Sequence, residues 1–293
     1  RHRWYWPKGR DPHSNVTDLC YSPDGRLLAG VVFRQDTGYV WDLATGQQIA
    51  ELAHHDIHGI SFSPDNRRLA TAGWDKVVRI WDAQTGKRIR EFDVGQLKDP
   101  KLDGDVRMHS VRYSPQNNLL ATLHLDSYVR IWDADDLRLI AQFDNGAWFT
   151  QGGSDFSPDG QWYATGDGAG QTRLWDPLTG QKVWDRGRQQ GGSKARGFGG
   201  IGQTLVSGDE GNCYLWDLRP ADVPLDKSVE ELWTDLAGND SPASYRAIWA
   251  LAGQPDAAVN IVGEKLRAVE DVTDISRVSL DEPKDEQQRR RRV

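Results

Sequence analysis

The stretch Phe62-Ser-Pro-Asp-Asn66, followed by Val77-Val-Arg-Ile-Trp81-Asp82, decides the fold of this chain. Ser, Pro and Asn stand in the first piece where a tight β-turn requires them. The second piece alternates β-branched with polar residues, which predicts a strand that ends in Trp-Asp. Strand-like residues 57–62 and 68–72 flank the turn. Together these pieces predict three antiparallel strands in one small sheet.

The same two landmarks recur along the chain. A short apolar strand ends in Trp-Asp five times, with the tryptophans at residues 41, 81, 132, 175 and 216, so successive tryptophans of this set are 40, 51, 43 and 41 residues apart. The aromatic-Ser-Pro turn occurs four times, at Tyr21–Gly25, Phe62–Asn66, Tyr113–Asn117 and Phe156–Gly160. A fixed period of this size is typical of repeat architectures. After Trp-Asp, Thr-Gly turns lead to a more polar fourth strand such as residues 88–92. Four antiparallel strands per repeat predict an all-β fold, a β-propeller of four-stranded blades.

These features resemble those of WD40-repeat β-propellers over about residues 13–218. The resemblance implies a hydrogen-bonded tetrad in each blade, and the second repeat has all four members: His54, Thr71, Asp75 and Trp81. Such a tetrad gives the buried indole N–H an acceptor. The third repeat has Thr122, Asp126 and Trp132, with Asp105 in place of His, and the fourth has Thr165 and Trp175, with Ala169 in place of Asp. The first repeat has His13 and Trp41, and the fifth has Ser207 and Trp216.

We therefore expect a propeller over residues 1–219, with five visible repeats. The opening residues 1–6 resemble a fourth strand. That strand either closes a five-bladed ring or is the remnant of an upstream blade. The chain begins with Arg1 rather than Met, which favours N-terminal truncation of a larger propeller.

The pattern changes to a helical period at about residue 220. Ser228 with Glu231 forms a capping box, and Pro242 and Pro255 each open a further helix. We expect a three-helix segment over residues 220–268, and it resembles the helical segment that follows the propeller in bacterial WD40 proteins of planctomycete type. Residues 269–293 are charged and read as a disordered tail; their Arg289–Arg292 run is interpreted as solvated rather than as a nucleic-acid contact.

Composition limits the classes of function. The net charge is −7 and the pI about 5.5, so we predict no nucleic-acid partner. No apolar run approaches the length of a membrane span, and no membrane association is predicted. Cys20 and Cys213 are read as small hydrophobes; such sparse cysteine suits a reducing compartment and a cytoplasmic location.

Catalytic and cofactor signatures are absent from the sequence, so neither a cofactor nor a metal is predicted. His54–His58 holds several potential metal ligands, but alternation along a strand sends neighbours to opposite faces. Asp99, Asp103 and Asp105 miss the spacing of a calcium loop. Asp176-Pro-Leu-Thr-Gly-Gln-Lys-Val-Trp184 resembles the repeat of quinoprotein dehydrogenases, but the match occurs in one repeat only.

We therefore predict a non-catalytic scaffold that binds other proteins; the sequence does not indicate an oligomeric state. The alternative is a propeller enzyme, or a propeller that binds a small ligand, in either case through the central channel. Convergent carboxylates, His or Arg at the mouth of the channel would favour this alternative. Interfaces are rich in Trp, Tyr and Arg. The loop residue beside the tetrad Asp is the candidate contact in each repeat, and these residues are Trp74, Leu125, Arg34 and Asp209. Packing of Trp74 on the neighbouring blade is the alternative interpretation.

Overall fold

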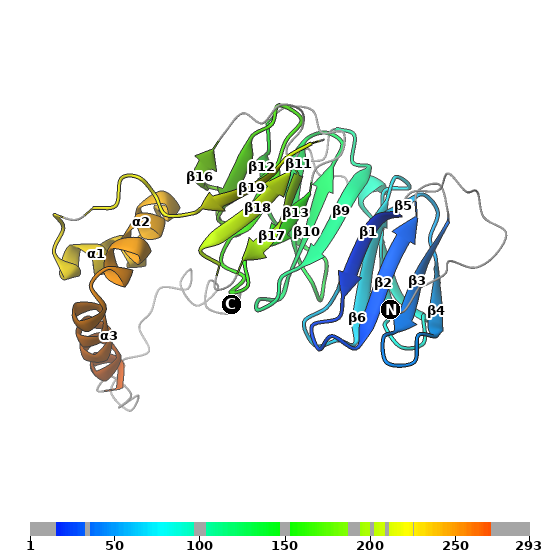
Figure 1. Cartoon of the computed structure of the whole chain (residues 1–293), viewed down its shortest axis with the longest axis horizontal. Helices are drawn as coiled ribbons and strands as arrows, with labels where there is room; N and C mark the ends of the chain where they lie inside the picture. The colour runs from blue at the N-terminus through cyan, green and yellow to red at the C-terminus, as the bar shows by residue number, and fades with distance from the viewer. Residues whose placement is uncertain are drawn as a thin grey trace, which may run out of the picture. The chain divides into compact units, whose positions relative to one another are not determined.

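A computed structural model describes residues 16–32, 36–96, 104–146, 153–186, 194–199, 202–208, 211–224 and 226–270. The chain divides into two compact units, Arg1–Pro220 and Ala221–Val293. The first unit consists of β-sheets and the second of helices (Figure 1).

The first unit contains five antiparallel sheets, one for each Trp-Asp repeat. The strands of the first four sheets are, in chain order, β1 (Val16–Tyr21), β2 (Leu27–Val32), β3 (Thr37–Asp42) and β4 (Gln48–Ala53); β5 (Ile57–Phe62), β6 (Arg68–Gly73), β7 (Val77–Asp82) and β8 (Arg88–Asp93); β9 (Met108–Tyr113), β10 (Leu119–His124), β11 (Tyr128–Asp133) and β12 (Leu139–Asp144); and β13 (Ser154–Phe156), β14 (Tyr163–Gly166), β15 (Thr172–Trp175) and β16 (Lys182–Arg186). A short 3₁₀ turn, Val94–Gln96, follows β8. The fifth sheet has three described strands, β17 (Lys194–Gly199), β18 (Thr204–Gly208) and β19 (Cys213–Asp217).

Local turn chemistry explains why these strands meet where they do. Between β5 and β6, the Ser63 hydroxyl bonds the Asp65 carboxylate and accepts the Arg68 N–H at 2.9 Å. Asn66 leaves the turn with φ 62°, a left-handed conformation that Asn tolerates better than most residues. Gly25 and Gly160 have the same positive φ in the equivalent turns. The predicted aromatic-Ser-Pro turns therefore form, and each one joins the first two strands of its blade.

The hydrophobic cores lie between neighbouring blades. The first strand of each sheet lies beside the first strand of the next (Figure 1). The residues of the fourth strands β4 and β8 are mostly exposed. One core joins Leu52 and Val40 of the first blade to Ile60 and Trp81 of the second. Equivalent cores bury Trp132 between the second and third blades, and Trp175 between the third and fourth. A blade cannot bury these faces alone, so blade-to-blade packing holds the array together. This arrangement confirms the predicted propeller blades.

The second unit has three helices, α1 (Val229–Ala237), α2 (Ser241–Ala252) and α3 (Pro255–Glu270). The capping box predicted at Ser228 is present, because Ser228 and Glu231 each bond the other's backbone N–H. Leu232, Ala247, Ala250 and Leu251 form the small core. No described helix is both long and apolar enough to cross a membrane. The predicted tail falls almost wholly on residues 271–293, outside the described residues.

Candidate functional site

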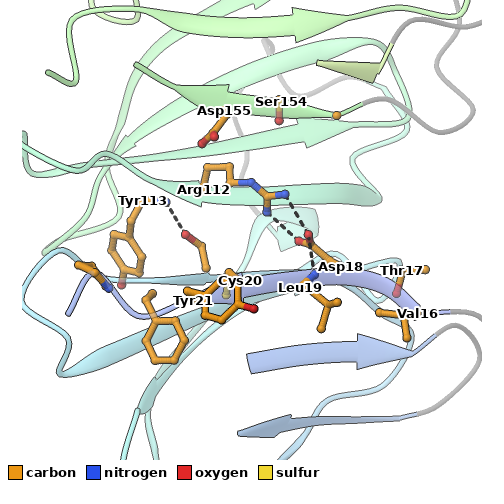
Figure 2. Close-up of a pocket in the computed structure, with 14 residues that line it drawn as sticks. Val16, Thr17, Asp18, Leu19, Cys20, Tyr21, Arg112, Tyr113, Ser154 and Asp155 are labelled. Carbon is orange, nitrogen blue, oxygen red and sulfur yellow. Dashed lines mark hydrogen bonds and ion pairs between the residues drawn. The ribbon is translucent and has the colours of Figure 1, made fainter. Parts of the chain in front are cut away.

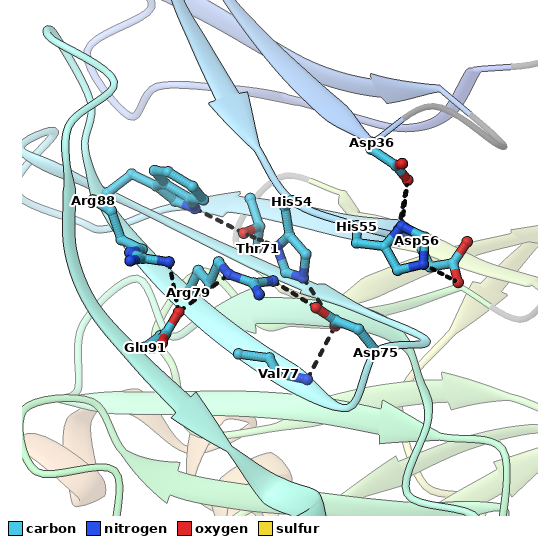
Figure 3. Close-up of polar contacts among 11 residues, drawn as sticks. Asp36, His54, His55, Asp56, Thr71, Asp75, Val77, Arg79, Arg88 and Glu91 are labelled. Carbon is cyan, nitrogen blue, oxygen red and sulfur yellow. Dashed lines mark hydrogen bonds and ion pairs between the residues drawn. The ribbon is translucent and has the colours of Figure 1, made fainter.

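The second blade contains a continuous hydrogen-bonded chain from its core to its surface (Figure 3). The Trp81 indole N–H donates to Thr71 Oγ1 at 2.8 Å, and Thr71 Oγ1 lies 2.6 Å from His54 Nδ1. His54 Nε2 lies 3.1 Å from Asp75 Oδ1. Asp75 also accepts the Val77 N–H at 3.1 Å and pairs with Arg79 at 2.6 Å. This chain closes the turn between β6 and β7 and so positions Trp74, the residue before Asp75.

The charges in this chain are arranged so that the imidazole is neutral. Burial lowers the pKa of His54, against the opposing effect of Asp75. Burial also opposes ionisation of Asp75, but its contacts with His54 and Arg79 outweigh this and keep the Asp75 pKa below its usual value. A neutral His54 can accept the Thr71 hydroxyl proton at Nδ1 and donate from Nε2 to Asp75. All four members are then satisfied by one proton arrangement.

The third and fourth blades build the same kind of chain from other residues. In the third, Trp132 donates to Thr122 at 2.7 Å, and Thr122 contacts His124 Nε2 at 2.7 Å. In the fourth, Trp175 donates to Thr165 at 2.8 Å, and Thr165 donates to Asn145 Oδ1 at 2.5 Å. In the fifth, Trp216 donates to Ser207 at 2.7 Å. Trp41 is buried in the first blade, and His13 lies outside the described residues.

Two repeats use other residues where a tetrad member is missing. Asp105 stands where the second repeat has His54, but its carboxylate holds Arg107, and the imidazole that contacts Thr122 is that of His124, on the same face of β10. Ala169 stands where the second repeat has Asp75, and the acid that pairs with the third-strand arginine in this blade is Asp167, 2.6 Å from Arg173. Asp167 lies six residues before its arginine, whereas Asp75 and Asp126 each lie four residues before theirs.

Trp74 lies at the loop end of the second blade, against side chains of the third. Its ring stacks on His58 with centroids 4.4 Å apart and an interplanar angle of 13°, and it meets the edge of His109 at 5.7 Å. The Arg107 guanidinium lies 5.3 Å from the Trp74 ring centroid. We call these four residues, Trp74, His58, His109 and Arg107, the Trp74 surface. The neighbouring blade therefore packs on Trp74 and leaves it half-buried.

The Trp74 surface combines uncharged rings with one held cation. Burial lowers the pKa of His58 and takes that of His109 to about 4, so both rings are neutral near pH 7. Arg107 donates to the Asp105 carboxylate through Nε and Nη2, and this pairing lowers the pKa of Asp105 and raises that of Arg107. The Trp74 indole N–H is buried and has no hydrogen-bond acceptor among the described residues. Such an orphaned donor costs about 1–3 kcal/mol.

Leu125 occupies the same place in the third blade. The backbone N–H of Trp74 donates to the Asp56 carbonyl, and the backbone N–H of Leu125 donates to the Arg107 carbonyl, each at 2.9 Å. Each of these residues precedes an Asp that pairs with an Arg, and each is half-buried. The backbone carbonyl of Arg107 thus accepts a hydrogen bond from Leu125, while the Arg107 side chain lies over Trp74. The other two candidates, Arg34 and Asp209, lie outside the described residues.

Two other groups raised by the sequence have structural explanations. The His55 ring lies between Asp36 at 2.9 Å and Asp56 at 3.4 Å (Figure 3), at an exposed site where each carboxylate already bonds the imidazole. Trp184, from the quinoprotein-like stretch, is buried and meets the edge of Trp216 at 6.1 Å. It therefore belongs to the packing between the fourth and fifth blades.

Blades with an outward-facing fourth strand and a buried Trp-Thr pair define a propeller repeat protein. The family model described as "WD domain, G-beta repeat" matches residues 9–42, 46–82, 100–133 and 152–176. The chain is a WD40-repeat protein. Its fifth sheet, β17–β19, lies beyond those four matches.

The relatives of this chain include proteins of several kinds. WD repeat-containing protein 3 of Mus musculus is 37% identical over 116 residues, 37% of this chain and 12% of that protein. Guanine nucleotide-binding protein subunit beta of Oryza sativa subsp. japonica is 29% identical over 178 residues, 58% of this chain and 46% of that protein. Periodic tryptophan protein 2 of Arabidopsis thaliana is 30% identical over 117 residues, 39% and 12% of the two chains. The chain thus spans less than half the length of each of these relatives.

Proposed function

We propose that this chain is a non-catalytic scaffold that binds another protein through the Trp74 surface and the adjoining Leu125. WD40-repeat proteins are generally non-catalytic, and one relative is named as a subunit of a larger protein. The observation that carries the proposal is the stacked group of Trp74, His58, His109 and Arg107 at the loop end of two blades.

The composition of this group suits recognition rather than chemistry. Trp and Arg are enriched among interface residues that dominate binding energy. The two histidines are neutral near pH 7 and serve as flat rings that fix the orientation of the indole. Asp105 fixes Arg107 in the same way, so little side-chain freedom is lost when a partner binds. A rigid, half-buried aromatic beside a held cation fits a partner segment that supplies apolar side chains and a backbone carbonyl or a carboxylate.

The orphaned indole N–H of Trp74 lowers the stability of the folded blade, and a binding role would account for this cost. The tryptophans Trp81, Trp132, Trp175 and Trp216 all donate their indole N–H to a Thr or Ser. Trp74 leaves its N–H without an acceptor among the described residues. Leu125 holds the equivalent place without this cost, so an aromatic there is not needed to close the turn.

The test is affinity capture with Trp74→Ala, Leu125→Ala and the double variant, against Leu178→Ala as a matched control. Leu178 is 58% exposed in the turn after β15, at the other end of its blade. Proteins captured by wild type and by Leu178→Ala but lost with the double variant support the assignment. Loss of a central Trp weakens binding by about 30-fold or more, the equivalent of ~2 kcal/mol. Unchanged capture by a correctly folded double variant would refute it.

The proposal extends to location and origin. We infer a cytoplasmic protein without nucleic-acid or membrane partners, supported by the acidic balance of the chain and by two cysteines that are both free. The helical segment's resemblance to planctomycete proteins supports a bacterial origin. Fractionation of cells that express the chain tests the location.

A further inference from the structure

A cavity of about 590 Å³ opens among the first strands of the first four blades (Figure 2). In each of these blades, the residue before the aromatic-Ser-Pro turn lines it, and these residues are Cys20, Ser61, Arg112 and Asp155. They come from β1, β5, β9 and β13. The cavity is therefore built from residues that lie more than forty positions apart but hold the same place in the repeat.

One ion pair spans the cavity wall. Arg112 Nη1 lies 2.7 Å from Asp18 Oδ2, and Arg112 Nη2 lies 3.0 Å from Asp18 Oδ1. Arg112 also donates to the carbonyl oxygens of Val111 and Ile60, and Asp18 accepts the Ile60 N–H at 3.0 Å. The two side chains are only 21% and 13% exposed. Arg112 thus pairs with Asp18 through both of its terminal nitrogens, and the two charges of this pair offset each other.

Asp155 lies on the other side of Arg112 and has no such partner (Figure 2). Among the described residues its carboxylate accepts one hydrogen bond, from the Phe156 N–H at 3.0 Å, and forms no ion pair. Burial raises the pKa of Asp155, against the opposing effect of Arg112. Among the side chains at this wall that the structure describes, two carboxylates thus face one guanidinium, which leaves one negative charge uncompensated. An unpaired buried charge is costly unless a counter-ion or water reaches it.

The surroundings of Asp155 leave this carboxylate accessible. The neighbouring Ser154 hydroxyl is already used by the Tyr163 hydroxyl at 2.7 Å and by Ser110 at 3.3 Å. On the next inner strand, β17, Gly197 approaches this carboxylate. A Cβ at Gly197 would lie 3.6 Å from Asp155 Oδ2, in ordinary van der Waals contact. The absence of a side chain there leaves room for a ligand atom beside that oxygen.

We propose that this cavity binds a guanidinium or primary ammonium group, which pairs with Asp155. One uncompensated charge matches a monovalent cation, and a single available carboxylate is too few for a Ca²⁺ ion, which takes six to eight oxygen ligands. The volume admits a cation together with its alkyl stem, which Tyr21 and Phe62 of the cavity wall would contact. This site is separate from the Trp74 surface and does not depend on the function proposed for it.

The test is isothermal titration with N-acetyl-arginine-methylamide and N-acetyl-lysine-methylamide, with the neutral N-acetyl-norleucine-methylamide as a third probe. Wild type should bind at least one cationic probe and not the neutral one. Asp155→Asn should weaken that binding tenfold or more, whereas Asp185→Asn, which removes a half-exposed surface carboxylate, should leave it unchanged. Trp74→Ala should also leave it unchanged, which separates this site from the protein-binding surface.

A pentapeptide, Gly-Gly-Arg-Gly-Gly, identifies the source of the cation. Tenfold tighter binding of the peptide than of the blocked amino acid points to a partner's side chain, and equal binding points to a small molecule; both outcomes support the site. Equal binding to wild type and a folded Asp155→Asn variant would overturn it. Equal binding of the neutral and cationic probes to wild type would also overturn the proposal, and that comparison needs no variant. If Asp155→Asn does not fold, Asp155→Ser takes its place.

Discussion

Replacing Thr71 by Val should destabilise the second blade far more than its size suggests. Thr71 is fully buried, and its hydroxyl both accepts the Trp81 indole N–H at 2.8 Å and contacts His54 Nδ1 at 2.6 Å. Val has nearly the same shape, so little cavity forms. The variant instead leaves a buried donor on Trp81 and a buried acceptor on His54 without partners.

The expected cost follows from these two groups. Leaving a buried polar group unsatisfied costs about 1–3 kcal/mol. Part of the second penalty is recovered if the His54 ring shifts toward Asp75, which lies 3.1 Å from its other nitrogen. We therefore expect Thr71→Val to lower the free energy of unfolding by about 2–4 kcal/mol, counted from two such penalties.

Urea unfolding followed by tryptophan fluorescence and circular dichroism measures this loss. Thr85→Val is the matched control, because Thr85 also bonds through its hydroxyl, to Asp82 at 2.7 Å, but in an exposed turn of the same blade. The control should change the free energy of unfolding by only about 0.5 kcal/mol. If the two variants shift the urea midpoint equally, with unchanged slopes, the reasoning about the buried chain is wrong.

Two further predictions concern packing between blades and pH. Gly59→Ala would place a Cβ 2.7 Å from the Val111 backbone nitrogen of the next blade, so it should lower the free energy of unfolding in urea by about 3 kcal/mol. Gly211→Ala, whose Cβ would meet no atom of the described structure within 4 Å, should be neutral. Equal effects of the two variants would contradict the close approach. Burial keeps His109, whose pKa is about 4, and His124 neutral in the folded state, whereas the unfolded chain gains protons below about pH 6.5. Stability should therefore fall as the pH drops from 6.5 toward 4, and His109→Phe should reduce that fall by about 1–2 kcal/mol; an identical pH profile for the variant would contradict it.

Turn chemistry is the part of this fold that sequence alone predicts well. The Ser63 hydroxyl and the positive φ of Asn66 depend on residues only a few positions apart, so the pattern that predicts the turn also contains its cause. The same holds for the Trp81–Thr71 pair, because the register of β6 and β7 sets it. The strands and the indole hydrogen bonds could therefore be read from spacing.

The remaining tetrad members could not be read in this way. His124 and Asn145 take the place of the expected His because each lies within reach of a buried threonine hydroxyl, at Thr122 and Thr165. Any side chain with a suitable polar atom in that space can supply the bond, so counting residues back from Trp does not find the partner. A His two positions after Thr on the same strand was the one available signal for the third blade.

The cavity charges show a more general limit of interpreting repeats. Recurring residues such as the aromatic-Ser-Pro turns report the architecture, whereas Cys20, Ser61, Arg112 and Asp155 hold one repeat position and share no chemistry. A pattern search discards such positions as variation. Only the placement of β1, β5, β9 and β13 side by side shows that Arg112 is taken by Asp18 and that Asp155 is not. In an array of nearly equal blades, a binding site has to be built from the residues that differ, because identical blades would offer a ligand no distinguishing contact.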